Sequence, residues 1–392
     1  MTMTINNEHN KLNVPNLRFP EFQGEWEKCR LGDITENFNL RNKDKIQYPM
    51  FSVTNDRGFV PQSEQFEGRD MVGEDIKAYK IIHTNDFAYN PARINVGSIA
   101  MYTGEKPCMI SSLYVCFKTT KEVNNEWLMQ LLKTPKMNYY YNVNGEGGVR
   151  VYLFYPNFAR IRMSIPKIEE QKKIAKLLNL IDERIATQNK IIEDLKKLKS
   201  AIIEKLYKEI QGTWYSYRQL FSIINERNKQ LEYSNVLSAS QERGMVSRED
   251  LNLDIHFERS NISTYKIVKN GDYVIHLRSF QGGFAFAEKT GICSPAYTVL
   301  RPNNLLVYGY LSNYFTSRDF VKSLIIVTYG IRDGRSINVD EWLDMKVVIP
   351  SKEQQTHIVN VIESIENKIK NEETYSNCLL NQKQYLLRQM FI

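Results

Sequence analysis

The chain carries the same pattern twice, and this internal duplication constrains the fold more than any other feature. The segment Ile165-Pro166-Lys167-Ile168-Glu169-Glu170-Gln171 returns as Ile349-Pro350-Ser351-Lys352-Glu353-Gln354-Gln355, displaced by 349 − 165 = 184 residues. Each copy follows a mixed segment and opens a long stretch with helical periodicity. A repeat of nearly half the chain predicts two similar globular domains, each joined to a long helix, and so two similar surfaces held at a fixed separation.

Shorter matches between the two halves occur in the same order along the chain, which makes chance a poor explanation. The matched pairs are Ser52–Gly58 with Ser238–Gly244, Tyr79–Ile81 with Tyr265–Ile267, Asp86 with Asp272, Ser111 with Ser294, and Gly148–Arg150 with Gly330–Arg332. Short apolar runs at 86–89 and 272–275 predict strands, whereas Trp127–Leu132 and Tyr310–Phe315 predict short helices. Strands and helices without a regular strand–helix–strand rhythm favour α+β domains.

The repeat also predicts where the domains begin and end. A chain of 392 residues exceeds what one hydrophobic core usually supports, so more than one domain is expected. We expect a tail at 1–25, a mixed domain at 26–165, a central helix at 166–212, a second mixed domain at 213–348 and a C-terminal helix at 349–392. The predicted fold class is α+β, with two similar mixed domains separated by two long helices and related by a pseudo-two-fold repeat.

Both long helices carry an apolar seam. Its positions recur at alternating spacings of four and three residues, which is the 3.5-residue period of a coiled coil. They are Ile174, Leu178, Ile181, Ile185, Leu195 and Ile202 in the first helix, and Ile358, Ile362, Ile365, Ile369, Leu379 and Leu386 in the second. Polar residues interrupt each seam, namely Gln188, Lys199, Glu372, Ser376 and Lys383. They restrict the register, because a buried charge must meet a suitable partner.

Two arrangements of the long helices are open. Each helix can pack on its own domain, or the two helices can pair with each other. A helix of roughly 40 residues spans about 60 Å and overhangs a domain of ordinary size. We therefore favour antiparallel pairing, with one globular domain at each end.

Composition and cysteine use limit the classes of function. The net charge of +7 and the pI near 8.9 favour polyanionic partners, although solvated lysines on helix surfaces give the same value. The five cysteines form no Cys-x-x-Cys pair and the five histidines do not cluster with them, so we expect a reduced, cytoplasmic compartment and no structural metal. The polar N-terminus does not resemble a secretory signal, and no apolar run approaches the length that crosses a bilayer.

Polar, turn-like stretches in both copies carry the candidate contacts to DNA. Arginine can bridge O6 and N7 of guanine, and Asn or Gln can bridge N6 and N7 of adenine. The candidates in the first copy are Asn55, Arg57, Arg93, Asn95, Ser98, Arg150 and Tyr152. Those in the second are Gln241, Arg243, His276, Arg278, Ser279, Gln281, Arg332 and Arg335. Polar turns are common, so the pattern matters more than any one residue: the loops differ between copies, while framework positions such as Gly97 and Gly283 persist.

The order and spacing of these features resemble the specificity subunits of type I restriction-modification systems. The residues that carry the resemblance are the opening Asn16–Pro20 with Trp26 and Leu31–Asp33, the strand and loop Gly271–Ile275, and the two Ile-Pro junctions with Glu170, Gln171, Gln354 and Gln355. The likeness covers nearly the whole chain. One departure is that the second junction has Gln354 where the first has Glu170.

The resemblance implies two target-recognition domains, each reading half of a bipartite, asymmetric site on double-stranded DNA. It also implies that the paired helices act as a ruler for the unspecified spacer and as docking surfaces for two methyltransferase subunits. In such systems these partners carry S-adenosylmethionine and methylate adenine N6. Restriction subunits add translocation and cleavage that depend on ATP and Mg, in defence against foreign DNA. No cofactor is expected in this chain.

The sequence contains no catalytic constellation. Asn90-Pro91-Ala92-Arg93 begins like the Asn-Pro-Pro-aromatic signature of amino-methyltransferases, but it lacks the second proline and the aromatic residue. Gly145-Glu146-Gly147 is not placed between a strand and a helix as a cofactor loop requires, and no phosphate-binding Gly-x4-Gly-Lys-Ser/Thr sequence exists. We therefore expect a non-catalytic chain. The alternatives are a coiled-coil scaffold without nucleic-acid contact and a stand-alone DNA-modifying enzyme.

Overall fold

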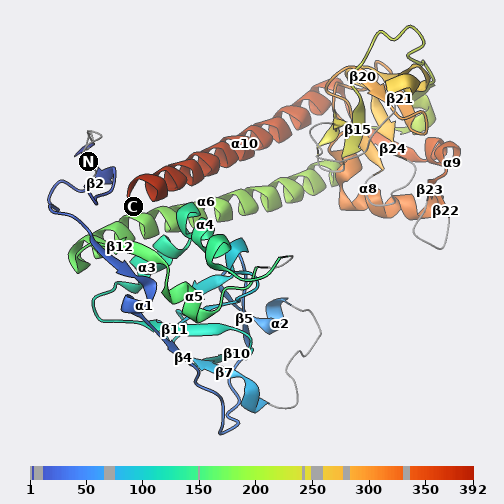
Figure 1. Cartoon of the computed structure of the whole chain (residues 1–392). Helices are drawn as coiled ribbons and strands as arrows, with labels where there is room; N and C mark the ends of the chain where they lie inside the picture. The colour runs from blue at the N-terminus through green and yellow to red at the C-terminus, as the bar shows by residue number, and fades with distance from the viewer. Residues whose placement is uncertain are drawn as a thin grey trace. The chain divides into compact units, whose positions relative to one another are not determined.

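The computed structural model describes residues 2–3, 12–65, 76–148, 151–240, 243–248, 259–276, 283–329 and 336–392 of the chain. It divides into two compact units: unit 1 is Met1–Gln188 with Tyr375–Ile392, and unit 2 is Asn189–Thr374. Each unit combines one mixed domain with a part of each long helix (Figure 1). Among the residues described, no helix is both long and apolar enough to cross a membrane.

Unit 1 is built on a four-stranded antiparallel sheet. Its strand order is β4 (Thr35–Phe38), β11 (Val115–Thr119), β8 (Phe87–Tyr89) and β9 (Ile99–Met101). All three side chains of β8 are buried, so both faces of the sheet are covered. Phe87, Tyr89 and Phe117 face the large core of the unit, whereas Ala88 and Cys116 face a smaller apolar cluster.

Short ladders and helices surround this sheet. β7 (Lys80–Ile82) pairs with β10 (Cys108–Ile110), β5 (Phe51–Val53) with β6 (Phe59–Pro61), β3 (Glu27–Arg30) with β12 (Arg162–Ile165), and β1 (Thr2–Met3) with β2 (Leu17–Arg18). The helices, with 3₁₀ helices marked η, are α1 (Leu31–Ile34), α2 (Gln62–Gln65), η1 (Ile76–Ala78), η2 (Ile94–Val96), α3 (Asn125–Leu132), α4 (Pro135–Asn144) and α5 (Tyr155–Ala159). Asn124 and Thr134 cap α3 and α4, because each side chain accepts the backbone N–H three residues on.

Unit 2 repeats the four-stranded sheet of unit 1 and its β7–β10, β5–β6 and β3–β12 ladders. Its sheet has the order β14 (Phe221–Ile224), β21 (Thr298–Pro302), β18 (Tyr273–Ile275) and β19 (Phe284–Phe286). The ladders are β17 (Lys266–Val268) with β20 (Gly291–Cys293), β15 (Leu237–Ser240) with β16 (Gly244–Ser247), β13 (Thr213–Ser216) with β24 (Lys346–Ile349), and β22 (Thr328–Tyr329) with β23 (Ser336–Ile337). The helices are α7 (Tyr217–Leu220), η4 (Arg259–Thr264), η5 (Tyr314–Thr316), α8 (Arg318–Ser323), η6 (Leu324–Val327) and α9 (Val339–Asp344). The predicted α+β fold and internal repeat are confirmed.

Buried polar contacts recur at equivalent places in the two units. Asp86 Oδ2 accepts the backbone N–H three residues earlier at 2.8 Å, and Asp272 Oδ2 does the same at 2.9 Å. A basic residue of the adjacent strand approaches each carboxylate: Lys118 Nζ lies 3.9 Å from Asp86 Oδ1, and Arg301 Nε donates to Asp272 Oδ1 at 2.9 Å. Burial raises the pKa of Asp86 above its ordinary value. The matched aspartates therefore close the same turn before β8 and β18.

The repeated glutamine of each Ile-Pro junction joins a domain to its long helix. The buried amide of Gln171 makes three hydrogen bonds: Nε2 donates to the carbonyl oxygens of Pro166 and Glu122 at 2.9 and 3.0 Å, and Oε1 accepts from the N–H of Asn124 at 2.8 Å. Gln355 makes the equivalent bonds at 3.1, 3.0 and 2.8 Å. Since each amide satisfies three backbone groups, the helix start is fixed against the domain.

From residue 12 onward, the segment predicted as an N-terminal tail packs against unit 1. Arg18 Nε and Nη2 each donate at 2.8 Å to one oxygen of the buried Glu170 carboxylate, and Trp26 Nε1 donates to the same group at 3.3 Å. The counterpart of Glu170 in unit 2, Gln354, is exposed. The difference between the two junctions therefore has a structural reason: Glu170 anchors the segment that leads into the first domain.

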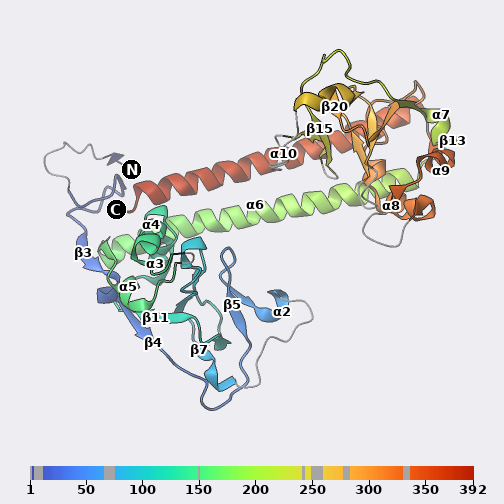
Figure 2. The same cartoon turned by 45° about the vertical axis from the view of Figure 1, so that its right-hand side comes forward.

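The two long helices are α6 (Ile168–Lys208) and α10 (Lys352–Gln389), close to the predicted bounds. They run antiparallel and side by side within each unit (Figure 1, Figure 2). In unit 1, Lys383 Nζ lies 2.5 Å from Asp182 Oδ1; in unit 2, Lys199 Nζ lies 2.6 Å from Glu366 Oε1. These are the same pair twice, because 182 + 184 = 366 and 199 + 184 = 383. The polar seam lysines therefore meet carboxylates on the opposite helix in both units.

The ends of the helices belong to the domain cores. Ile174 and Leu178 of α6 lie in the core of unit 1 with Leu386 and Met390 of α10. In unit 2, Ile358 and Ile362 of α10 lie in the core with Ile203 of α6. Every apolar residue of the predicted seam is buried or half-buried. The two arrangements left open by the sequence thus coexist: helix ends pack on a domain, and the helices also contact each other.

One predicted helix is absent. Trp127–Leu132 is helical as expected within α3, but in the segment Tyr310–Phe315 the first four residues form turns and the last two belong to the 3₁₀ helix η5. Gly309 adopts a left-handed conformation with φ of 71°, and the Ser312 hydroxyl donates to its carbonyl oxygen at 2.7 Å. A serine side chain that takes a nearby backbone carbonyl competes with helical hydrogen bonding, which the apolar pattern of the sequence does not reveal.

Candidate nucleic-acid interface

The first candidate loop of unit 1 is the tip of the β5–β6 hairpin. Thr54 N and Oγ1 both donate to Gly58 O, at 2.8 and 3.1 Å, and Thr54 Oγ1 accepts the Arg57 N–H at 3.0 Å. Gly58 has φ of 67°, a conformation that suits glycine in a tight turn. The side chains of Asn55 and Arg57 are exposed on this closed tip. Both predicted contact residues therefore project from a backbone that its own hydrogen bonds hold in place.

The second candidate loop runs from residue 90 to residue 98 and lies against the first. A Cβ atom added to Gly97, whose φ is 102°, would lie 2.9 Å from Asn55 O. Ser98 is buried, and its hydroxyl donates to Val53 O at 2.7 Å. The structure therefore places Ser98 beneath the loops as a link between them, not on the surface where the sequence placed it. Arg93, which immediately precedes η2, is exposed.

A relay of two amides sets the orientation of Asn95 in this second loop. Asn142 of α4 donates from Nδ2 to the carbonyl oxygen of Asn138 at 2.8 Å, which fixes the direction of its amide. Its Oδ1 accepts from Asn95 Nδ2 at 3.0 Å. Because a carbonyl can only accept, Asn95 must present nitrogen to Asn142. Among the described residues the Asn95 amide has no other partner, so its Oδ1 and second N–H remain open, the pair that adenine recognition uses.

Tyr152 lies on a neighbouring segment of unit 1. Its backbone N–H and carbonyl pair with those of Glu146 at 2.8 Å each, and the following Leu153 N–H donates to Pro91 O at 2.9 Å. The Tyr152 ring stacks on that of Phe154, with centroids 6.2 Å apart and planes 13° apart, and both rings are exposed. Exposed aromatic faces of this kind suit stacking on sugars or bases.

Unit 2 forms the equivalent hairpin between β15 and β16, and it retains the arginine before the glycine. Gly244 has φ of 67°, as Gly58 does, and the Arg243 N–H donates to Ser240 Oγ at 3.3 Å. Arg243 is exposed, whereas His276 is half-buried with its ring edge-on to that of Tyr297 at 5.0 Å. The other predicted contacts lie outside the described residues: Arg150 in the first copy, and Gln241, Arg278, Ser279, Gln281, Arg332 and Arg335 in the second.

Asn55, Arg57, Arg93, Asn95 and Tyr152 thus form the loop surface of unit 1. The predicted residues come from segments up to 97 positions apart, since 152 − 55 = 97, and backbone contacts from Gly97 to Asn55 and from Leu153 to Pro91 join these segments. Sequence reasoning missed Asn142 and Phe154. Asn142 lies on a helix and its role depends on a contact 47 residues distant in the chain, so no local signal identifies it.

No group of three or more His, Cys, Asp or Glu side chains that can hold a metal ion occurs within the described part of the chain. Burial raises the pKa of the Cys108 and Cys116 thiols in unit 1, and of Cys293 in unit 2, to about 12. These thiols stay protonated near neutral pH and are poor nucleophiles.

Comparisons with known proteins agree with this geometry. Residues 23–197 match the family model described as the type I restriction modification DNA specificity domain. A putative type I restriction enzyme MjaX specificity subunit of Methanocaldococcus jannaschii is 23% identical, over 91% of this chain and 90% of its own length. The type I restriction enzyme MjaVIII specificity subunit of the same organism is 24% identical, over 94% and 91%. A solved chain from a study of assembly and conformational transition of the type I R-M system has the same fold, with a TM-score of 0.60 at 14% identity, over 92% of this chain and 96% of its own.

Proposed function

Because this chain resembles the specificity subunits of type I restriction-modification systems, we propose that it is one of them and that each of its two units reads one part of a bipartite site on double-stranded DNA. The observation that carries this proposal is a single framework built twice with different loops. β5–β6 and β15–β16 form hairpins with the same left-handed glycine and an exposed arginine before it, Arg57 or Arg243. The next candidate loop differs in sequence, with Arg93-Ile94-Asn95 in the first copy and Leu277-Arg278-Ser279 in the second. A shared framework with different loop residues suits two different words of DNA.

The loop surface of unit 1 has the chemistry that base reading needs. Arg57 and Arg93 can each donate two hydrogen bonds to guanine, and the oriented amide of Asn95 suits adenine. The backbone hydrogen bonds that close these loops also reduce the entropy lost on binding, because the loops are ordered before DNA arrives. An Arg and Asn surface of this kind gives sequence selectivity, whereas a lysine-rich surface gives mainly phosphate attraction.

The long helices set the distance between the two words in this proposal. Half-sites centred about one helical turn apart, roughly 34 Å, present the same face of the duplex. The 41 residues of α6 span about 60 Å, which is enough to cover that distance. The support is the doubled ion pair between α6 and α10, because a register fixed by charged contacts resists sliding of one helix along the other.

The proposal assigns chemistry to partner subunits. Two methyltransferase subunits would bind S-adenosylmethionine and methylate adenine N6, and restriction subunits would use ATP and Mg to translocate and cut DNA. The chain directs them to the site and performs none of these steps itself. The names of its relatives, specificity subunits of type I restriction enzymes, support this division of labour.

The test is to lengthen the ruler. Seven residues inserted at the middle of both α6 and α10 keep the seam in register and add about 10 Å. The spacer should then grow by about 3 base pairs, while both recognised words stay unchanged. Sequencing of N6-methyladenine in DNA exposed to the assembled methyltransferase complex measures words and spacer together. An unchanged spacer in the insertion variant would contradict the role of the helices as a ruler. Methylation without sequence selectivity by the complex of the wild-type chain would contradict DNA reading.

A further inference from the structure

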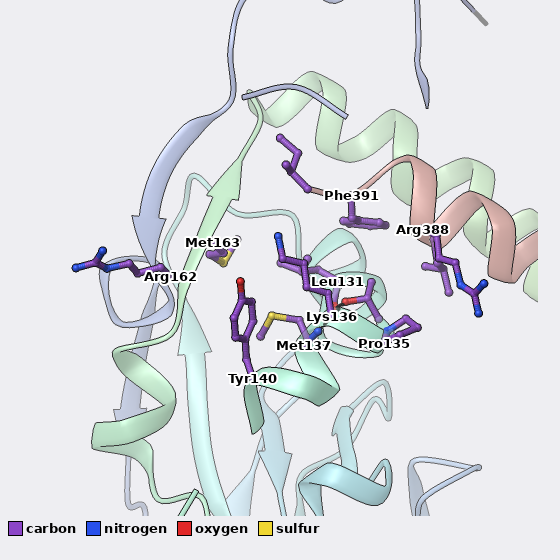
Figure 3. Close-up of a pocket in the computed structure, with 12 residues that line it drawn as sticks. Leu131, Pro135, Lys136, Met137, Tyr140, Arg162, Met163, Arg388 and Phe391 are labelled. Atoms are coloured by element: carbon purple, nitrogen blue, oxygen red, sulfur yellow. Dashed lines mark hydrogen bonds between the residues drawn. The ribbon is translucent and has the colours of Figure 1, made fainter. Parts of the chain in front are cut away.

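Unit 1 contains an apolar pocket that none of the loop-surface residues lines. It lies among α3, α4, β12 and the C-terminal end of α10, and its volume is about 140 Å³ (Figure 3). The apolar side chains around it include Leu131, Met137, Tyr140, Met163 and Phe391. A cavity of this size and lining accepts one aromatic ring, as small apolar molecules fill comparable cavities in other proteins.

The lining of the pocket differs between the two copies of the repeat. Thr134 and Ser317 are equivalent residues, because each caps a helix by accepting the N–H three residues on. Met137 therefore corresponds to Phe320, and Leu131, three residues before the cap, to Tyr314. In unit 2 the rings of Tyr314 and Phe320 lie 5.3 Å apart and belong to the core. Unit 1 has aliphatic side chains at both positions, and both of them line the pocket.

The charges around the pocket also differ between the units. Lys136, Arg162 and Arg388 line the pocket of unit 1. Figure 3 shows the two arginines on opposite sides with their guanidinium groups directed outward. Their charges are all positive, and among the described residues neither arginine forms an ion pair with a carboxylate.

The counterparts of these residues in unit 2 are Asp319, Lys346 and Glu204, the last because 388 − 184 = 204. Their charges are mixed, and Arg318 Nε lies 3.5 Å from Glu204 Oε1. Unit 2 thus carries charges of both signs at this place, whereas unit 1 has an apolar pocket bordered by Lys136, Arg162 and Arg388.

We propose that this pocket binds an aromatic side chain of a partner protein, on a segment whose flanking residues are Asp or Glu. The ring would fill the space between Leu131 and Met137, and the carboxylates would meet Arg162 and Arg388 outside it. In protein interfaces a buried aromatic side chain commonly contributes much of the affinity, and complementary charges around it contribute specificity. Because aromatic rings and mixed charges occupy the equivalent place in unit 2, the described part of the chain offers this contact in unit 1 and not at that place in unit 2. This inference rests on the proposed function only in requiring that the chain works as a subunit.

The pocket is tested by fluorescence anisotropy on the full chain with short labelled peptides. The probe is Asp-Glu-Phe-Asp-Glu, and its controls are Asp-Glu-Ala-Asp-Glu and Lys-Lys-Phe-Lys-Lys. We expect the probe to bind roughly tenfold tighter than the alanine peptide, as burial of one ring implies, and the basic peptide not to bind. Equal binding of the probe and the alanine peptide would show charge attraction alone and overturn the proposal, as would no binding of the probe.

Two variants locate the binding. Met137→Phe places in unit 1 the residue that unit 2 carries at the equivalent position. Arg388→Glu reverses one charge at the edge of the pocket. Each variant should reduce the affinity for the probe about tenfold. The matched control is Lys346→Glu, the charge reversal at the unit 2 counterpart of Arg162, which should leave binding unchanged. Equal weakening by Arg388→Glu and Lys346→Glu would refute the site. DNA selectivity of Arg388→Glu should match the wild type, so failure of the pocket and failure of DNA reading remain distinguishable.

Discussion

Glu170→Ala should destabilise unit 1 far more than Gln354→Ala destabilises unit 2, although the two positions are equivalent in the repeat. Glu170 is 2% exposed and accepts two hydrogen bonds from Arg18, which is 13% exposed, and one from the Trp26 indole. Removing one member of a buried pair leaves the other charge without compensation, at a cost of about 3–5 kcal/mol. Gln354 is exposed, so its replacement should change the free energy of unfolding by less than about 0.5 kcal/mol.

Urea unfolding followed by tryptophan fluorescence measures this difference, since Trp26 lies against the carboxylate in question. With a urea slope of about 3 kcal/mol per molar, the expected loss lowers the midpoint by roughly 1 to 1.7 M. The double variant Arg18→Met with Glu170→Met should regain most of it, because it removes both charges and keeps the volume. A Glu170→Ala midpoint within 0.2 M of Gln354→Ala (roughly the size of a surface effect) would refute the reasoning.

Two further predictions concern DNA. Asn142→Ala should reduce discrimination for adenine at the position read by Asn95. The loss should approach that expected for Asn95→Ala, about 1–3 kcal/mol or roughly 5- to 150-fold. Competition binding with single-base variants of the site measures both losses, and full discrimination by the Asn142→Ala complex would show that the relay does not orient Asn95. If each unit neutralises about four phosphates, the logarithm of the binding constant of the assembled complex should fall with the logarithm of salt concentration at a slope of roughly −7; a slope near zero in a salt titration would favour the scaffold alternative.

The features that the sequence predicted well depend on repetition. The duplicated junction, the matched aspartates Asp86 and Asp272, and the 3.5-residue seam each occur twice in one chain, so a coincidence of local composition is an insufficient explanation. The structure adds their causes. Gln171 recurs as Gln355 because both satisfy three backbone groups at a helix start.

What the sequence could not predict depends on contacts between distant segments. Ser98 lies in a polar, turn-like stretch of the sequence and is therefore predicted to contact DNA. The fold shows instead that it is buried and that its hydroxyl donates to Val53 O. Asn142 belongs to a helix without an evident polar stripe, and its proposed role in orienting Asn95 depends on the hydrogen bond between the two amides. The turns at Tyr310–Phe315 carry an apolar pattern that fits a helix equally well, and the deciding features are a left-handed Gly309 and a serine hydroxyl bonded to it.

Selection of bound sequences from random DNA tests the central claim most directly. The assembled complex of the wild-type chain, and one with Arg93→Ala and Asn95→Ala, are compared for information content at each base position. Two fixed words at a constant spacing are predicted for the wild type, and the variant should lose information in one word while the other remains intact. A single uninterrupted word, or equal decay of both words in the variant, would contradict the reading of separate words by separate units.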